Sequence, residues 1–183
     1  MKGLIFNEFL AFVEQTMTYD MVDKIILKSN IESGGAYTSI GTYDPQEFFK
    51  LLTALSEETG TSKKQLLITY GEHLFGVFAT DYPQFFKNSG SVFQFLCTVE
   101  AHVHAEVKKY YSDASFPHFR CKTVPPNTLI MEYRSPRHLA DLAEGLIRGC
   151  IHFHQENIDI IRESMPVKQG EKAQFILTKR EMQ

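Results

Sequence analysis

The sequence predicts an α+β fold, with a mainly helical N-terminal part and a small C-terminal antiparallel sheet of two hairpins around an intervening helix. Three observations predict it. Apolar residues recur at helical spacing through most of residues 4–111. After Tyr111 the apolar period shortens, and short strand-like runs alternate with turn residues. The 183 residues, 43% hydrophobic and 22% charged, have the length and composition of one ordinary globular domain.

The helical elements come first along the chain. Asp44 and Pro45 predict a helix start, because aspartate is a favourable N-cap and proline is tolerated at the first helical position. A glycine-rich loop over residues 33–44 leads into that helix. The predicted helices share apolar residues at helical spacing, and they cover residues 4–15, 19–29, 45–55, 61–78 and 92–111.

The strand-like elements follow. Residues 118–124 and 128–135 are two short runs separated by the turn cluster Pro-Pro-Asn, which predicts a hairpin. Ser135 and Pro136 then predict a helix from Arg137 to about Phe153. Residues 157–180 alternate apolar and polar side chains around a turn at Gly170, which predicts the second hairpin.

Composition narrows the class of protein. No apolar run is long enough to span a bilayer, and the opening residues, interrupted by Glu8, do not form a secretory signal. We therefore expect a cytoplasmic protein. A net charge of −3 without a basic block makes nucleic acid and anionic membranes poor partners. The 15 Phe and 8 Tyr either form a dense core or surround something flat and apolar.

Histidine carries the first functional signal, because four of the seven form H-x-H pairs at residues 102–104 and 152–154. On a helix, positions i and i+2 point in different directions, so neither pair should chelate one metal. His104 shares an apolar stripe with Cys97, Ala101, Val107 and Tyr111, whereas the face of His102 is more polar. An inward His104 is either a hydrogen-bonded core residue or an axial metal ligand. A lone ligand suits haem better than zinc, which needs three or four protein ligands.

The second signal is Tyr133-Arg134-Ser135-Pro136-Arg137. Tyr133 and Ser135 lie two residues apart at the end of a strand, so both should face the same side. In the local interpretation, Ser135 caps the next helix and Arg137 is solvated. In the functional interpretation, two hydroxyls and one guanidinium at a helix N-terminus bind an anionic group, such as the propionates of haem.

Together these features resemble the H-NOX family, the haem-nitric oxide/oxygen-binding domains that also form the sensor of soluble guanylate cyclases. The resemblance spans essentially the whole chain, from the opening MKGLIFNEFLAFVE, typical of stand-alone bacterial members, through YGEHLFGVF to Tyr-x-Ser-x-Arg. In the family, Pro-x-Phe-Arg-Cys follows the axial histidine at a fixed distance. That motif stands here at residues 117–121 and selects His104.

The resemblance implies one domain over residues 1–183, with an N-terminal helical subdomain (1–60), a haem-holding part (61–183) and the haem sandwiched between helices and sheet. It implies one haem b per chain with His104 as its axial ligand, and Pro117 pressing on and distorting the porphyrin. Tyr133, Ser135 and Arg137 would hold the propionates. The expected distal pocket consists of Phe9, Leu74, Phe78 and Leu142. Zinc is not expected, because no cysteine follows Cys150, whereas zinc-binding relatives carry a C-terminal cysteine cluster.

The distal side indicates which gas should bind. Oxygen-binding members of the family carry a tyrosine three residues before a glycine on the helix after the motif. Here Leu142 stands at that position, before Gly145. The resemblance therefore implies binding of NO and CO, but not of O₂.

The expected function is a haem-based nitric oxide sensor and not an enzyme. In the family, NO weakens the bond between iron and histidine, and the conformational change regulates a signalling protein in trans. The expected partner is a histidine kinase or a cyclic-di-GMP enzyme, that is, a diguanylate cyclase or phosphodiesterase. Two alternatives stay open: a non-haem metal-dependent enzyme that uses the H-x-H pairs, and a haem-free interaction module with a structural His104.

Overall fold

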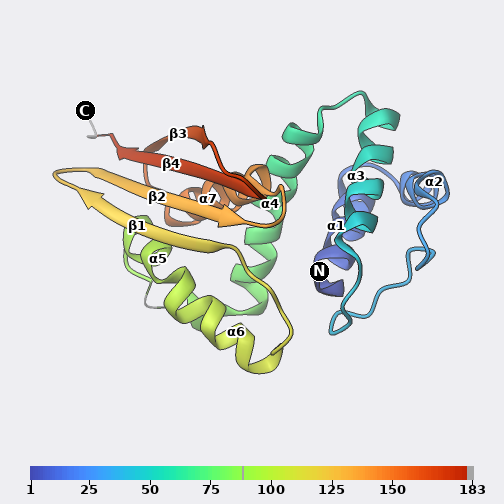
Figure 1. Cartoon of the computed structure of the whole chain (residues 1–183), viewed down its shortest axis with the longest axis horizontal. Helices are drawn as coiled ribbons and strands as arrows, with labels where there is room; N and C mark the ends of the chain where they lie inside the picture. The colour runs from blue at the N-terminus through green and yellow to red at the C-terminus, as the bar shows by residue number, and fades with distance from the viewer. Residues whose placement is uncertain (88, 181–183) are drawn as a thin grey trace. The chain divides into compact units, whose positions relative to one another are not determined.

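The structure is a computed structural model that describes residues 1–87 and 89–180. Its contacts divide the chain into two compact units (Figure 1). The first unit comprises Met1–Tyr70 together with Asp113–Ser115, and the second comprises the other described residues from Gly71 onward. Helices dominate the first unit, and an antiparallel sheet with helices forms the second. The predicted α+β class is thereby confirmed.

An aromatic core holds the first unit together. Phe6, Phe9 and Phe48 are fully buried, and the rings of Phe9 and Phe48 lie 5.1 Å apart at 64°. The buried Tyr70 donates a hydrogen bond of 2.7 Å to the backbone oxygen of Ile5, which satisfies its hydroxyl inside this apolar core. The unit contains α1 (Gly3–Thr16), α2 (Tyr19–Ser29), α3 (Pro45–Thr59) and the first half of α4 (Lys63–Asp81).

The second unit is built on one four-stranded antiparallel sheet in the order β1-β2-β4-β3. The two predicted hairpins are present, and they join because β2 pairs with β4. The strands are β1 (His118–Val124), β2 (Thr128–Ser135), β3 (Ile158–Met165) and β4 (Glu171–Lys179). Helix α7 (Ala140–His154) covers one face of the sheet and packs Ile147 and Cys150 into a core with Leu129 and Phe175 (Figure 1).

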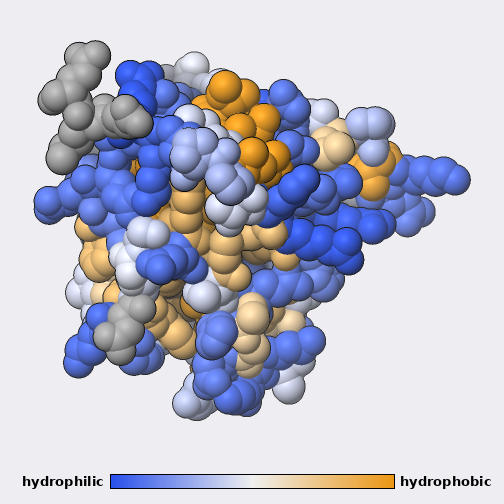
Figure 2. All heavy atoms as spheres, turned by 90° about the vertical axis from the view of Figure 1, so that its left-hand side faces the viewer, coloured by the Kyte–Doolittle hydropathy of each residue, from blue (hydrophilic) through white to orange (hydrophobic). Residues whose placement is uncertain are grey.

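The surface at the sheet end of this unit mixes polar and apolar side chains. Figure 2 shows hydrophobic residues gathered near the middle of this face, with hydrophilic residues around them. A folded protein normally keeps much apolar surface exposed, so this grouping alone assigns no function to the face. None of the helices in residues 1–87 and 89–180 is both long and apolar enough to cross a membrane.

Two helix predictions need correction. The helix expected over residues 92–111 is divided into α5 (Val92–Thr98), a π-helix (Val99–His104) and α6 (Ala105–Tyr110). The helix expected from Arg137 begins only at Ala140, whose N–H donates to the Glu171 carboxylate at 2.9 Å. Ser135 does not cap it, because its hydroxyl accepts the Arg137 N–H at 3.1 Å and closes a local turn. A short 3₁₀ helix (Pro83–Phe85) follows α4.

Candidate functional site

His104 is the last residue of the π-helix, and its side chain is half-buried. Its ring stacks on Phe116, with centroids 4.5 Å apart and planes 18° apart, and lies 5.9 Å from the ring of Phe119. His102 is exposed. The orientation of the two histidines is therefore the one that the sequence predicts.

The apolar stripe predicted around His104 is only partly present. Val107 and Tyr111 are half-buried, but Cys97 and Ala101 are exposed. The reason is the π-helix, because its i→i+5 hydrogen bonds break the 3.6-residue period on which the stripe was predicted. The exposure of positions 97 and 101 agrees with this break in the period, and π-helical turns are often found at functional sites.

A carboxylate that the sequence analysis missed attaches the π-helix to the sheet. Glu100 accepts hydrogen bonds from the Phe119 N–H and, at 3.1 Å, from Nδ1 of His118. Burial raises the pKa of Glu100, but these hydrogen bonds outweigh burial and hold it below the ordinary value. Glu100 therefore stays ionised and fixes the first turn of the π-helix against β1. Its only signal in the sequence is its place four residues before His104.

The His104 side chain is electrically neutral near pH 7. Burial lowers its pKa to about 4, and the attraction of the Glu100 carboxylate offsets this only in part. Its Nδ1 atom is buried and has no hydrogen-bond partner among the residues that the structure describes. An uncharged imidazole is the form of histidine that binds metals.

Tyr133, Ser135 and Arg137 lie together at the end of β2. Tyr133 and Ser135 are both buried on one face of the strand, as the alternation of side chains predicts. The Tyr133 hydroxyl donates to the backbone oxygen of Arg137 at 3.5 Å. Burial raises the pKa of Tyr133 to about 12, although a hydrogen bond with Ser135 and the charge of Arg137 lower it in part. Tyr133 therefore keeps its proton and remains a hydrogen-bond donor.

The predicted anion clamp needs one correction. Arg137 lies in the turn between β2 and α7 and not in a first helical turn, so the clamp does not lie at a helix N-terminus. Its three side chains are instead grouped by the strand end and the turn that follows. The candidate donors are two hydroxyls and one guanidinium, which suit a carboxylate ligand.

Phe119 connects His104 with this group. Its ring lies 5.9 Å from His104 and 5.7 Å from Tyr133. Pro117, half-buried, stands between Phe116 and His118 on the segment that enters β1. The predicted metal ligand and the predicted anion clamp therefore flank one aromatic side chain of the second unit. The importance of Phe116 and Phe119 as neighbours of His104 was also missed from the sequence.

The predicted distal residues occupy three elements. Leu74 on α4 and Leu142 on α7 are buried, and the half-buried Phe78 packs its ring 6.2 Å from that of Tyr82. The two helices touch, since a Cβ placed on Gly71 would come within 2.6 Å of the Leu142 backbone oxygen. Phe9 belongs to the aromatic core of the first unit.

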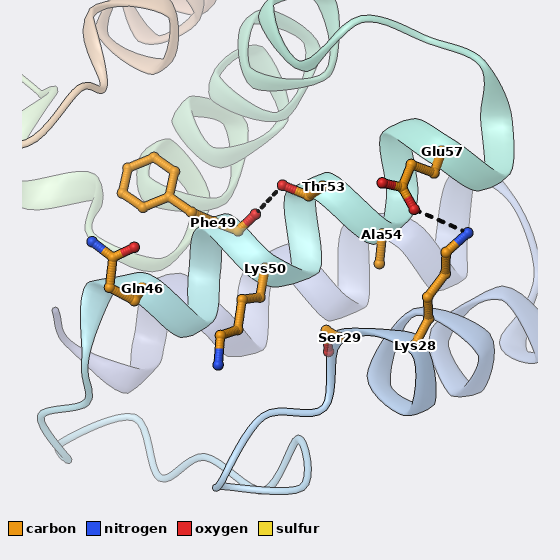
Figure 3. A pocket seen from close by; sticks show the side chains of 8 residues that line it. All are labelled: Lys28, Ser29, Gln46, Phe49, Lys50, Thr53, Ala54 and Glu57. Carbon is orange, nitrogen blue, oxygen red and sulfur yellow. Dashed lines mark hydrogen bonds and ion pairs between the residues drawn. The ribbon is translucent and has the colours of Figure 1, made fainter.

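The hollow drawn in Figure 3 lies between α2 and α3 of the first unit, with a volume of about 340 Å³. Some of its polar groups have partners within its lining. Lys28 pairs with Glu57 at 3.2 Å, and the Thr53 hydroxyl donates to the Phe49 backbone oxygen at 2.7 Å (Figure 3). None of the residues predicted for the site lines it. Across the described residues, no group of three or more His, Cys, Asp or Glu side chains could hold a metal ion.

Comparison with known proteins adds independent information. The sequence matches the family described as haem-NO-binding over residues 2–162. It is similar to the Fe(II) unliganded H-NOX protein of K. algicida, with 40% identity over 100% of this chain and 98% of that chain, and a TM-score of 0.92. No curated protein matches it.

Two further solved structures have the same fold. One is an H-NOX protein of S. oneidensis in the Fe(II)NO ligation state, with 23% sequence identity and a TM-score of 0.90. The match covers 99% of this chain and 100% of the S. oneidensis chain. The H-NOX of Shewanella woodyi in the Fe(II)CO ligation state is 29% identical over 98% of this chain and 95% of that chain, with a TM-score of 0.84.

Proposed function

This chain belongs to the haem-NO-binding (H-NOX) family of haem-binding gas sensors, and from that premise we propose that it is a nitric oxide sensor with one haem b held by His104. One observation carries the assignment of the ligand. His104 offers an uncharged imidazole that stacks on Phe116, and its buried Nδ1 has no hydrogen-bond partner in residues 1–87 and 89–180. A single protein ligand suffices for haem, because the porphyrin supplies the four equatorial nitrogens.

In the proposal, Tyr133, Ser135 and Arg137 hold the haem propionates. The protonated Tyr133 hydroxyl and the Ser135 hydroxyl can each donate to a carboxylate, and the Arg137 guanidinium supplies the opposite charge. Their grouping within one strand end and one turn supports this role. Pro117 is proposed to press on the haem, because it lies on the segment between Phe116, which stacks on His104, and β1.

The proposed gas preference depends on the distal residues. Phe9, Leu74, Phe78 and Leu142 are all apolar, so none of them can donate a hydrogen bond to a bound gas. Such a pocket favours NO and CO and discriminates against O₂, whose complex with ferrous iron is polar. The related proteins of S. oneidensis and S. woodyi, solved in NO and CO ligation states, support the first half of this proposal.

The π-helix carries the proposed ligand of the haem iron at its end. When bound, haem would supply the iron that binds NO. His104 would hold that iron, and loss of this bond would release the end of the π-helix that carries His104. Because π-helical turns are rare beside α-helical ones, this segment suits a two-state element biased by a ligand. The proposed receiver, a histidine kinase or a cyclic-di-GMP enzyme, rests on the family resemblance alone.

The ferrous absorption spectrum tests this function. We expect a Soret band from the haem-loaded protein, a shift of that band on addition of NO, and no stable oxygen complex in air. A protein without a Soret band after haem reconstitution would contradict the sensor. A stable oxygen complex would contradict only the gas preference.

A further inference from the structure

Glu100 shares a helix with the proposed haem ligand but binds a different segment of the chain. It is the second residue of the π-helix (Val99–His104), and His104 is the last. One oxygen of the Glu100 carboxylate accepts the Phe119 N–H, and the other lies 3.1 Å from Nδ1 of His118. Nδ1 of His104, by contrast, has no hydrogen-bond partner among the described residues. Glu100 therefore holds the helix that carries His104 and not the His104 ring itself.

The two ends of the π-helix contact the same short segment, residues 116–119. At the end of the helix, the ring of His104 stacks on Phe116 with centroids 4.5 Å apart. Near its start, Glu100 accepts the backbone N–H of Phe119, which lies in β1 and pairs with β2. The π-helix is therefore attached at both ends to a segment that the sheet holds in place.

The attachment through Glu100 is the more directional of the two. Flat rings can slide past each other, whereas a hydrogen bond from a backbone N–H to an ionised carboxylate has a defined direction and is stronger than a neutral one. Hydrogen bonds outweigh burial and hold the pKa of Glu100 below its ordinary value, so the carboxylate is ionised near pH 7.

We propose that Glu100 is a positioning residue for the bond between His104 and the haem iron, a role that rests on the proposed function. By binding the Phe119 N–H, the carboxylate fixes the π-helix where the His104 ring meets Phe116. A ligand held in one orientation by its supporting residues loses less conformational freedom when it binds. Glu100 thereby lets His104 present a single imidazole orientation to the iron, and it needs no contact with the haem to do so.

The charge of Glu100 offers a competing explanation, because the carboxylate also attracts a proton to His104. Two variants separate position from charge. Glu100→Gln loses the charge but keeps a side-chain oxygen that can accept the Phe119 N–H. Glu100→Asp keeps the charge, but its shorter side chain moves the carboxylate away from that N–H. Glu100→Ala loses both.

The stretching band between iron and histidine in the resonance Raman spectrum of the ferrous, haem-loaded protein tests the positioning role. We expect this band to broaden in Glu100→Ala and Glu100→Asp, because His104 then takes several orientations, and to keep its width and frequency in Glu100→Gln. Glu106→Ala is the matched control, since Glu106 lies two residues beyond His104 and pairs with Lys109 on its own helix. An unchanged band in Glu100→Ala would overturn the proposal, as would equal changes in Glu100→Gln and Glu100→Ala.

Hydrogen exchange tests the attachment of the π-helix separately. Amides of residues 99–104 should exchange several-fold faster in Glu100→Ala and Glu100→Asp than in the wild type, Glu100→Gln or Glu106→Ala. Equal exchange in Glu100→Ala and the wild type would overturn the attachment. Absence of the iron–histidine band from the wild type would contradict the proposed function. A normal wild-type band that does not respond to Glu100→Ala would contradict only the role of Glu100.

Discussion

At the scale of single residues, the proposed site depends on His104. Replacing it with glycine removes the only proposed protein ligand of the iron, so His104→Gly should lose most of its bound haem, and added imidazole should restore it. The measurement is the haem content per chain from the absorption spectrum. His102→Gly is the matched control, because His102 is exposed two residues away and should keep its haem. Unchanged haem in His104→Gly would refute its role as ligand.

Leu142 offers a second test with one side chain. In the proposed pocket, Leu142→Tyr introduces a hydroxyl donor, and a hydrogen bond worth about 1 kcal/mol raises affinity roughly fivefold. We expect the variant to gain a measurable oxygen complex in air, seen in the ferrous spectrum. Leu142→Phe adds the same ring without the hydroxyl and should not gain one. If both variants bind oxygen alike, pocket shape and not the hydrogen bond decides the preference.

At the scale of elements, local signals predict most boundaries well. Asp44 caps α3 through a 2.9 Å hydrogen bond from Gln46, and both hairpins lie where alternation and turn residues indicate them. The errors have a common cause in tertiary contacts. The π-helix is attached through Glu100 to β1, and the start of α7 is set by Glu171 of β4. Neither contact leaves a local pattern, so the residues around His104 could be predicted only in part.

The contact between α4 and α7 gives a prediction with its own control. A Cβ at Gly71 would lie 2.6 Å from the Leu142 backbone oxygen and 2.8 Å from the Cα of Gly145, which are both too close. Gly71→Ala should therefore lower the free energy of unfolding by about 1–3 kcal/mol through overpacking. At Gly76, on the same helix, such a Cβ would meet no atom within 4 Å from other described parts of the chain beyond its own helical turn. Gly76→Ala should stabilise the helix by about 0.5–1 kcal/mol. Urea unfolding measures the free energy of unfolding of both variants. Equal changes in Gly71→Ala and Gly76→Ala would show that the close contact at Gly71 does not limit side-chain size.

At the scale of the whole molecule, a short segment joins parts of the chain that are far apart in sequence. Asp113–Ser115 follows α6 but belongs to the first unit. Asp113 pairs with Lys2 at 2.7 Å and accepts a hydrogen bond of 2.6 Å from the Thr42 hydroxyl. Contacts over such separations leave no sequence pattern, and the predicted division at residue 60 did not include this segment. That division stays a prediction.

The pH dependence of this contact can be predicted. Hydrogen bonds from Lys2 and Thr42 lower the pKa of Asp113 from 3.8 to about 2. The pKa of Asp113 is lower in the folded state than in the unfolded chain, so ionisation of its carboxyl stabilises the fold. This stabilisation is complete above pH 3.8 and is lost as the pH falls toward 2. Asp113→Asn should therefore melt at a lower temperature than the wild type at pH 7. The gap should narrow below about pH 4 because the native carboxyl also becomes neutral there. Thermal unfolding followed by circular dichroism from pH 7 downward measures it. Asp23→Asn, at an exposed position on α2, is the control. A gap that stays constant with pH would show that the carboxylate charge does not stabilise this contact.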